Sequence, residues 1–186
     1  MLEGKTVNLR VLERDDIDFL AECFNNMYFW GEYSNPVFEQ TSKSGLMQNF
    51  DNPPNIAISI EWKKFIVQKK DGNRMGFVWH FINQPYGVME IGCFFVPSER
   101  GKGYGAEATQ LMVDYLFLSK NIGRIQACTN VRNKTAQKVL EKAGLKIEGT
   151  IRKLLFVRGA WTDYHLYSIL REEWKEPKIL TRTEKK

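Results

Sequence analysis

A glycine-rich segment in the middle of the chain has the residue types and spacing of an anion-binding loop. It runs from Val96 to Ala108 and has glycine at every second position from 101 to 105. The pattern predicts a strand before it and an amphipathic helix after it, so free backbone N–H groups would converge at the helix start. Glycine permits positive φ and close backbone approach, and Arg100 and Lys102 add positive charge. The segment predicts a phosphate-binding loop; a plain glycine-rich turn is the alternative.

Two common phosphate-binding motifs do not fit this loop. A nucleoside-triphosphate loop needs a hydroxyl residue directly after its lysine, but Gly103 follows Lys102. A dinucleotide fingerprint could be placed on Gly103, Gly105 and Ala108. About 20 residues further on it would need an acidic residue, where the chain has Ile125 and Gln126.

Metal and covalent chemistry have little support in the sequence. Cys23, Cys93 and Cys128 are scattered and form no Cys-x-x-Cys pair, which favours buried thiols over a disulfide framework or a zinc site. His80 and His165 have no ligand-type residues at suitable spacing, so we expect no metal. No nucleophile-elbow motif is present in the sequence.

The charges are unevenly distributed. The net charge is +5, but the segment from Glu13 to Asp51 has eight acidic and two basic residues, a net charge of −6. Such a segment could attract a cationic partner, whereas Asp15, Asp16 and Asp18 could simply favour a helix N-terminus. A basic remainder without a recognition motif does not predict nucleic-acid binding.

Length and composition predict one globular domain. The 186 residues are 43% hydrophobic and 26% charged, as in typical globular proteins. The sequence has no apolar stretch long enough to span a membrane and no basic, apolar leader, so we expect a cytoplasmic protein. We assign residues 1–176 to the domain and residues 177–186 to a basic tail that frays.

The elements around the loop follow from periodicity and turn residues. The first helix is predicted from Asp15 or Asp16 to Met27, and a weaker helical pattern runs from Thr41 to Phe50, followed by a loop at residues 52–55. A third helix is predicted around Ala108 to Leu118. A fourth is predicted between the N-cap Asn133 and the C-terminal stop at Gly144. The helix after the loop should bury Ala108, Leu111, Met112, Tyr115 and Leu118. Strands are predicted at residues 7–12, 62–69, 74–83, 88–96, 124–129, 146–157 and 161–170, and the second to fourth of these should form an antiparallel meander.

The loop resembles the acetyl-coenzyme A pyrophosphate loop of the GNAT superfamily of N-acetyltransferases. The shared pattern is Arg-x-x-Gly-x-Gly, from Arg100 to Gly105. The resemblance extends over residues 7–174. Within the superfamily, the chain is most similar to the branch of ribosomal-protein alanine N-acetyltransferases (RimJ/RimL type). The residues that resemble this branch are Glu90–Gly92, Asn133, Val139–Leu145, Glu148–Gly149, Gly159, Asp163 and Leu170–Trp174.

This resemblance implies an α/β (α+β) fold and an acetyl-CoA site. The fold would be a single-domain, mixed, mostly antiparallel sheet, flanked by helices, whose fourth and fifth strands splay apart so that the pantetheine arm adds to the fourth strand. Asn133 would contact the donor near its reactive end, unless it only caps a helix. The implied donor-binding residues are Phe94, Phe95, Val96, Arg100, Gly101, Lys102, Gly103, Tyr104, Gly105, Ala106 and Asn133.

The implied reaction is direct attack of a primary amine on the thioester in a ternary complex. Glu90 matches a strand position where such enzymes often have a glutamate facing the cleft, and is our candidate general base; a surface glutamate is the alternative. The usual proton donors to the leaving thiolate are missing, because Ala136 and Leu140 stand at the positions of a serine and a tyrosine. Gln126 stands where the branch often has glutamate.

The acceptor is expected to be a protein N-terminal amine, with a polyamine or another small amine as the alternative. Trp30, Glu32 and Tyr33 could bind it by charge and cation–π contacts, although the aromatic residues could equally belong to the core. A non-catalytic acetyl-CoA sensor is the competing class. The sequence specifies no metal cofactor, no membrane or nucleic-acid partner and no oligomeric state.

Overall fold

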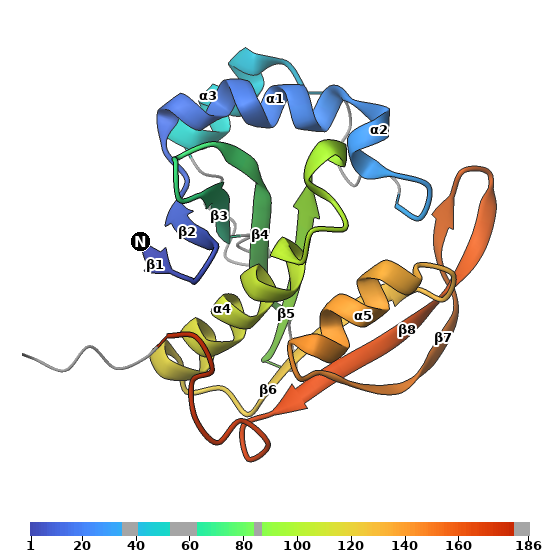
Figure 1. Ribbon diagram of the computed structural model, residues 1–186. Coiled ribbons are helices and arrows are strands. Elements are labelled where there is room, and N and C mark those ends of the chain that lie inside the picture. The colour runs from blue at the N-terminus through green and yellow to red at the C-terminus, as the bar shows by residue number, and fades with distance from the viewer. Residues whose placement is uncertain (35–40, 53–62, 84–86, 181–186) are drawn as a thin grey trace, which may run out of the picture.

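One twisted sheet forms the centre of the protein, and the helices lie on its two faces (Figure 1). The computed structural model describes residues 1–34, 41–52, 63–83 and 87–180. Within them the strand order is β1-β2-β3-β4-β5-β6-β8-β7, and β5–β6 is the parallel pair among antiparallel neighbours. The strands are β1 (Leu2–Glu3), β2 (Val7–Val11), β3 (Lys63–Lys69), β4 (Arg74–Asn83), β5 (Val88–Phe95), β6 (Arg124–Asn130), β7 (Lys146–Val157) and β8 (Ala160–Leu170).

The helices follow the predicted order, with short additions. The helices are α1 (Ile17–Asn25), α2 (Met27–Trp30), α3 (Lys43–Asp51), α4 (Tyr104–Ser119) and α5 (Lys134–Lys142), with 3-10 turns at Arg14–Asp16 and Pro97–Glu99. The first helix was predicted to reach Met27, but it ends at Asn25. Asn26 is extended, and its side chain accepts a hydrogen bond from the Tyr28 N–H to start α2. The predicted loop at residues 52–55 lies, from residue 53 on, outside the described residues.

The predicted antiparallel meander is confirmed. β3, β4 and β5 are consecutive antiparallel neighbours. The β3–β4 turn needs a glycine because Gly72 has φ +88°, in the left-handed region. β1, a two-residue edge strand, was not predicted; it is short because Gly4 then turns the chain back into β2.

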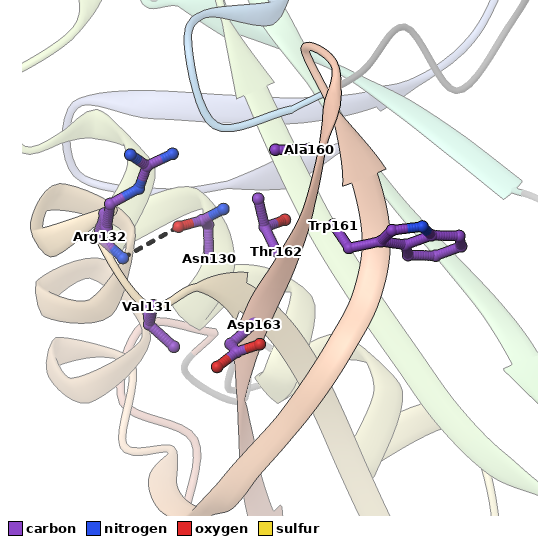
Figure 2. Close-up of a pocket in the computed structure, with 7 residues that line it drawn as sticks. All are labelled: Asn130, Val131, Arg132, Ala160, Trp161, Thr162 and Asp163. Atoms are coloured by element: carbon purple, nitrogen blue, oxygen red, sulfur yellow. Dashed lines mark hydrogen bonds between the residues drawn. The ribbon is translucent and has the colours of Figure 1, made fainter.

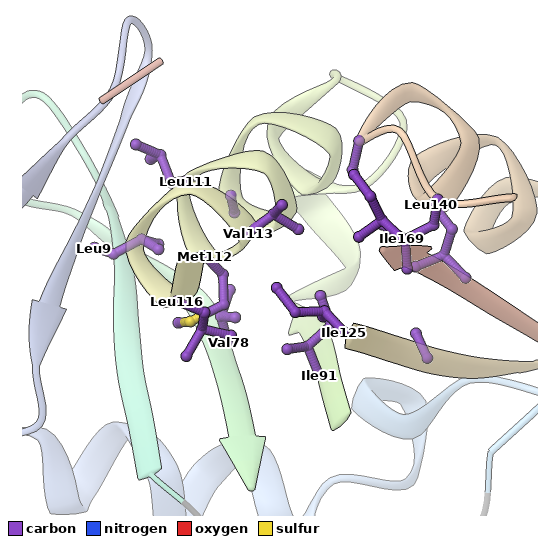
Figure 3. Close-up of a cluster of buried hydrophobic side chains, with 14 of the residues drawn as sticks. Leu9, Val78, Ile91, Leu111, Met112, Val113, Leu116, Ile125, Leu140 and Ile169 are labelled. Carbon is purple, nitrogen blue, oxygen red and sulfur yellow. The ribbon is translucent and has the colours of Figure 1, made fainter. Parts of the chain in front are cut away.

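The main core lies between α4 and the sheet (Figure 3). Leu111, Met112 and Leu116 are fully buried against Leu9, Val78, Ile91 and Ile125 from four strands. The predicted apolar face of α4 was wrong at Leu118, which is 48% exposed near the end of the helix. Helix α4 is covered by α5 as well as by the sheet, so its buried surface is wider than one stripe and includes Val113.

A second core covers the opposite face of the sheet. Phe24, Phe29 and Trp30 from α1 and α2 pack with Phe77 of β4.

The start of α1 is fixed by Asp16, which is fully buried and forms 2.6 Å ion pairs with Arg10 and Arg74. Burial alone would raise the pKa of Asp16, but these arginines and the Glu13 N–H outweigh burial and lower it.

The chain after β8 is attached to α4. Buried Asp114 accepts hydrogen bonds from the Trp174 indole (2.9 Å) and from the backbone N–H groups of Ile179 (2.8 Å) and Leu180 (3.2 Å). The frayed tail predicted from residue 177 therefore does not include these two residues. Residues 181–186 lie outside the described part of the chain.

Candidate active site

The strands β5 and β6 separate soon after they begin to pair. Their parallel register has two positions, Met89 opposite Ile125 and Glu90 opposite Gln126, although β5 continues to Phe95 and β6 to Asn130. Figure 1 shows the two strands diverging beyond this point. The edge of β5 after Glu90 is therefore available, within the described residues, to pair with an extended ligand, because backbone N–H and C=O groups need partners.

The predicted glycine-rich loop joins the end of β5 to the start of α4. Gly101 and Gly103 have φ values of +77° and +91°, which L side chains rarely adopt. Ala106 and Glu107 donate their N–H groups to the Gly103 carbonyl and so form the first turn of α4. The 16-residue helix thus points its positive end into the loop.

The two basic side chains of the loop have different environments. The Arg100 guanidinium donates to the Phe95 carbonyl over 2.9 Å and also to the Phe29 carbonyl, and so ties the loop to β5 and α2. Lys102 lies 3.0 Å from Glu99, which also binds Lys69 at 2.7 Å. These two lysines lower the pKa of Glu99. Arg100 thus orders the loop, a role that the sequence pattern did not indicate.

Asn133 is the N-cap of α5, as predicted. Its Oδ1 accepts a hydrogen bond from the Ala136 N–H over 3.0 Å. This capping bond uses the amide oxygen and leaves the two amide N–H groups of Asn133 without a partner among the described residues. The geometry accommodates both roles considered for Asn133, the cap and a contact with the donor.

Glu90 lies at the point where β5 and β6 separate. It is half-buried, and its Oε2 accepts a hydrogen bond from Nε2 of Gln126 over 3.0 Å. On β4, Phe81 is its register partner, and the Trp79 ring covers neighbouring Gly92, where an added Cβ would lie 2.3 Å from the ring. The carboxylate therefore has aromatic side chains on one side and an amide on the other.

The comparisons with known proteins identify the family of this chain. The family model described as an acetyltransferase (GNAT) domain matches residues 6–146. The chain belongs to the GNAT acetyltransferase family. The uncharacterized N-acetyltransferase YnaD of Bacillus subtilis is 30% identical over 151 residues, with 74% of this chain and 88% of that protein covered. The putative ribosomal N-acetyltransferase YdaF of the same species is 27% identical over 178 residues, with 92% and 95% covered.

A solved N-acetyltransferase structure shows the same fold. The spermidine N-acetyltransferase of Vibrio cholerae, in complex with CoA and spermine, superposes with a TM-score of 0.76 at 26% identity and covers 90% of this chain and 97% of that one. The chain is thus an acetyl-CoA-dependent N-acetyltransferase with the GNAT fold. In the described part of the chain, no helix is long and apolar enough to cross a membrane, and no His, Cys, Asp and Glu side chains form a metal-binding cluster.

Of the residues predicted to bind the acceptor in this GNAT domain, Trp30 belongs to the core. Its side chain is 3% exposed, packs edge-on against Phe94 and donates its indole N–H to the Phe24 carbonyl over 3.1 Å. The core alternative given for this tryptophan is therefore the one the structure supports. It has this place because α2 turns its ring toward β5 rather than toward solvent.

Glu32 and Tyr33 lie on the segment after α2. Glu32 is exposed, and Tyr33 is half-buried with the Arg132 guanidinium 5.9 Å from its ring centroid. The Tyr164 hydroxyl donates to the Tyr33 carbonyl over 2.9 Å, and Arg158 donates to the Gly31 carbonyl over 2.9 Å. These bonds join the segment to the β7–β8 hairpin. The cation–π position of Tyr33 is thus occupied by an arginine of the same chain.

The GNAT domain has a shallow hollow of about 320 Å³ beside this segment (Figure 2). The hollow was not predicted from the sequence, because its walls come from the end of β6 and the start of β8, which are far apart in the chain. Asn130 accepts a hydrogen bond from the Arg132 N–H over 3.0 Å at its edge. The lining residues are Asn130, Val131, Arg132, Ala160, Trp161, Thr162 and Asp163.

The cysteines and the missing proton donors match the sequence analysis in part. All three thiols are free; Cys23 is buried, whereas Cys93 and Cys128 are half-buried. Burial, and secondly the charge of Glu90, raise the pKa of Cys128 to about 11, so it is a neutral thiol at pH 7.

Leu140 packs in the main core and Ala136 has no ionisable group, so neither can protonate a thiolate.

Proposed function

We propose that the chain acetylates the α-amino group of a peptide or protein N-terminus, with Glu90 as the general base. This activity would place it in the RimJ/RimL-type branch of the family. The observation that carries the proposal is the position of Glu90: it lies where β5 and β6 separate, and one of its oxygens is held by Gln126. A base at this position lies beside the gap between β5 and β6, where the donor and the acceptor would meet.

The donor-binding role of the splay and the loop is part of the proposal. Acetyl-CoA supplies the acetyl group as a thioester. The free edge formed by Phe94, Phe95 and Val96 would pair with its extended arm, and the backbone of residues 100–106 would bind its pyrophosphate at the start of α4. The amide N–H groups of Asn133 would donate to the donor near its reactive end.

Glu90 would remove the proton that the attacking amine loses as its nitrogen bonds to the acetyl carbon. An α-amino group has a pKa of about 8 and is partly neutral at pH 7, whereas a lysine-like amine has a pKa of about 10.4. The leaving thiol has a pKa of about 8.5, so the thiolate can depart without a dedicated acid at Ala136 or Leu140. The absent proton donors are therefore compatible with catalysis.

The acceptor side supports an N-terminal amine over a polycation. Trp30 is buried, and Arg132 covers Tyr33. Within the acidic segment, Asp16 is paired with Arg10 and Arg74, Asp18 with Lys43, and Asp51 with Arg14. Three of the eight acidic side chains of this segment are therefore already paired within the fold.

A polyamine acceptor is the second candidate, because of the relatives. The Vibrio cholerae structure that superposes on 90% of this chain is a spermidine N-acetyltransferase, and Glu32 is an exposed carboxylate near the hairpin. A carboxylate base also has most effect on an amine of high pKa.

An assay of thiol release separates these acceptors. The enzyme and acetyl-CoA are incubated with spermidine, with short peptides that begin with free Ala or Ser, and with the same peptides carrying a blocked N-terminus and an internal lysine. We expect release with the free N-termini, and mass spectrometry should place the acetyl group on the α-amine. Release with spermidine alone would favour the second candidate. Acetyl-CoA binding without any release would favour a non-catalytic sensor.

A further inference from the structure

Glu90 belongs to a row of polar side chains that crosses three neighbouring strands. Glu90 is paired in register with Gln126 on β6, and Gln126 with Ser168 on β8. Directly opposite residues on adjacent strands point to the same face of a sheet. Gln126 therefore links the proposed base to the strands beyond the splay.

The orientation of the Gln126 amide is set from both of its ends. Nε2 donates to Glu90, while Oε1 accepts from Nε and Nη2 of Arg124, at 3.4 Å each. The reversed amide would place an oxygen against the Glu90 carboxylate and N–H donors against a guanidinium that can only donate. Both neighbours thus select the same orientation.

Arg124 is itself held in place by β7 and β8. Its two terminal nitrogens bind the two oxygens of Glu148 at 2.7 Å each, and the Ser168 hydroxyl donates to the same carboxylate. Two parallel bonds fix a guanidinium more strictly than a single contact does. Arg124 and, secondly, Ser168 lower the pKa of Glu148 to about 2, so this carboxylate stays charged at any assay pH.

We propose that Gln126 is a positioning residue that holds the Glu90 carboxylate toward the acceptor, and that the Arg124–Glu148 pair fixes the Gln126 amide for this purpose. This inference rests on the proposed role of Glu90 as the base. The Gln126 bond engages one carboxylate oxygen and leaves the other to accept the proton of the amine.

The other titratable groups on this face are few within the described residues. Cys128 follows on the same face of β6, and its pKa of about 11 keeps it neutral below pH 9. Arg124 stays charged. Lys64 shares the face from β3, opposite Trp79, and burial lowers its pKa. A Glu90→Gln variant is therefore needed to assign the acidic limb of a pH profile.

The test measures two midpoint pH values in the full-length protein. The first is the midpoint of the acidic limb in a plot of kcat/KM against pH for the accepted amine. The second is the midpoint of a ¹³C NMR titration of the Glu90 carboxyl carbon. Gln126→Leu should move both midpoints up and lower kcat/KM severalfold at pH values below the wild-type midpoint, while kcat/KM on the plateau above the midpoint changes less. Glu148→Gln should move them in the same direction by less. Lys146→Gln is the matched control, because Lys146 lies opposite Ser168 on β7 but pairs with exposed Glu173.

The outcomes separate this inference from the proposed function. If Glu90→Gln removes the acidic limb but Gln126→Leu moves neither midpoint, the positioning role is overturned and the base remains. If Glu90→Gln leaves the limb in place, the base is wrong and the positioning role falls with it. Equal shifts in Glu148→Gln and Lys146→Gln would contradict the role of the Arg124–Glu148 pair. Thermal melts of each variant check that it is folded.

Discussion

Glu90 and Gln126 form the last register pair of β5 and β6, and a 3.0 Å hydrogen bond joins their side chains where the strands separate. The parallel pairing thus ends at the residue that we assign as the base. Beyond it the β5 edge is left for an extended ligand. The same short stretch of sheet therefore determines both where the donor could pair and where a proton could be removed.

Replacing Glu90 should affect acceptors according to their pKa. Glu90→Gln keeps the size of the side chain and a partner for Gln126 but removes the base. We expect kcat to fall about 100-fold or more for a lysine-like amine and about tenfold for an α-amine at pH 7, because the α-amine is already partly neutral. Steady-state kinetics with matched peptides measure both values. Equal losses for the two amines would contradict a base role.

The left-handed backbone of the loop should be needed for CoA binding. Gly103→Ala adds a side chain where φ is +91° and no atom lies within 4 Å, so it costs about 1–2 kcal/mol through backbone strain alone. Gly72→Ala, at φ +88° in the exposed β3–β4 turn, is the matched control. Both should lower thermal stability similarly, but only Gly103→Ala should weaken CoA binding in calorimetry. Equal CoA affinities would argue against a loop that binds the donor.

Two substitutions separate the roles of Asn133. Asn133→Ala removes the α5 cap and should cost about 1 kcal/mol of unfolding free energy. Asn133→Asp keeps an oxygen for the Ala136 N–H but has no amide donor. We expect Asn133→Asp to retain stability in denaturant titrations while its KM for acetyl-CoA rises severalfold. An unchanged KM would leave Asn133 as a cap alone.

The Glu148 carboxylate should contribute stability that depends on pH. Its pKa is lowered from 4.5 to about 2, so the contribution is present above pH 4.5 and is lost as the pH falls toward 2. The side chain is 38% exposed, so solvent screening keeps the contribution below about 1 kcal/mol. Melting curves of Glu148→Gln should show a smaller loss of Tm across this range than wild type. Exposed Glu172→Gln is the control and should follow wild type.

Burial of Trp30 predicts a stability effect rather than a binding effect. Trp30→Ala should cost about 3–5 kcal/mol, because it empties a well-packed aromatic site beside Phe24 and Phe94. Trp30→Phe should stay folded, with the KM for the acceptor unchanged. A KM that rises in the folded Trp30→Phe variant would return this residue to the acceptor site.

Several features were determined by the sequence itself, because they depend on neighbours close along the chain. Alternating glycines followed by an apolar periodic stretch predicted the loop and α4, and Asn133 before an apolar helical face that ends at Gly144 predicted the cap of α5. The three strands of the meander followed from period-two patterns separated by turn residues. The absence of a hydroxyl at positions 136 and 140 is also a property of the sequence alone.

Other features were decided by the tertiary structure, because they depend on residues far apart in the chain. The register of β5 against β6 places Glu90 opposite Gln126, 36 residues later. The path of α2 over β5 buries Trp30, and the return of the β7–β8 hairpin brings Tyr164 to Tyr33, 131 residues away. Periodicity identifies which side of a strand is apolar, but only the packed sheet determines which polar side chains meet on its other side.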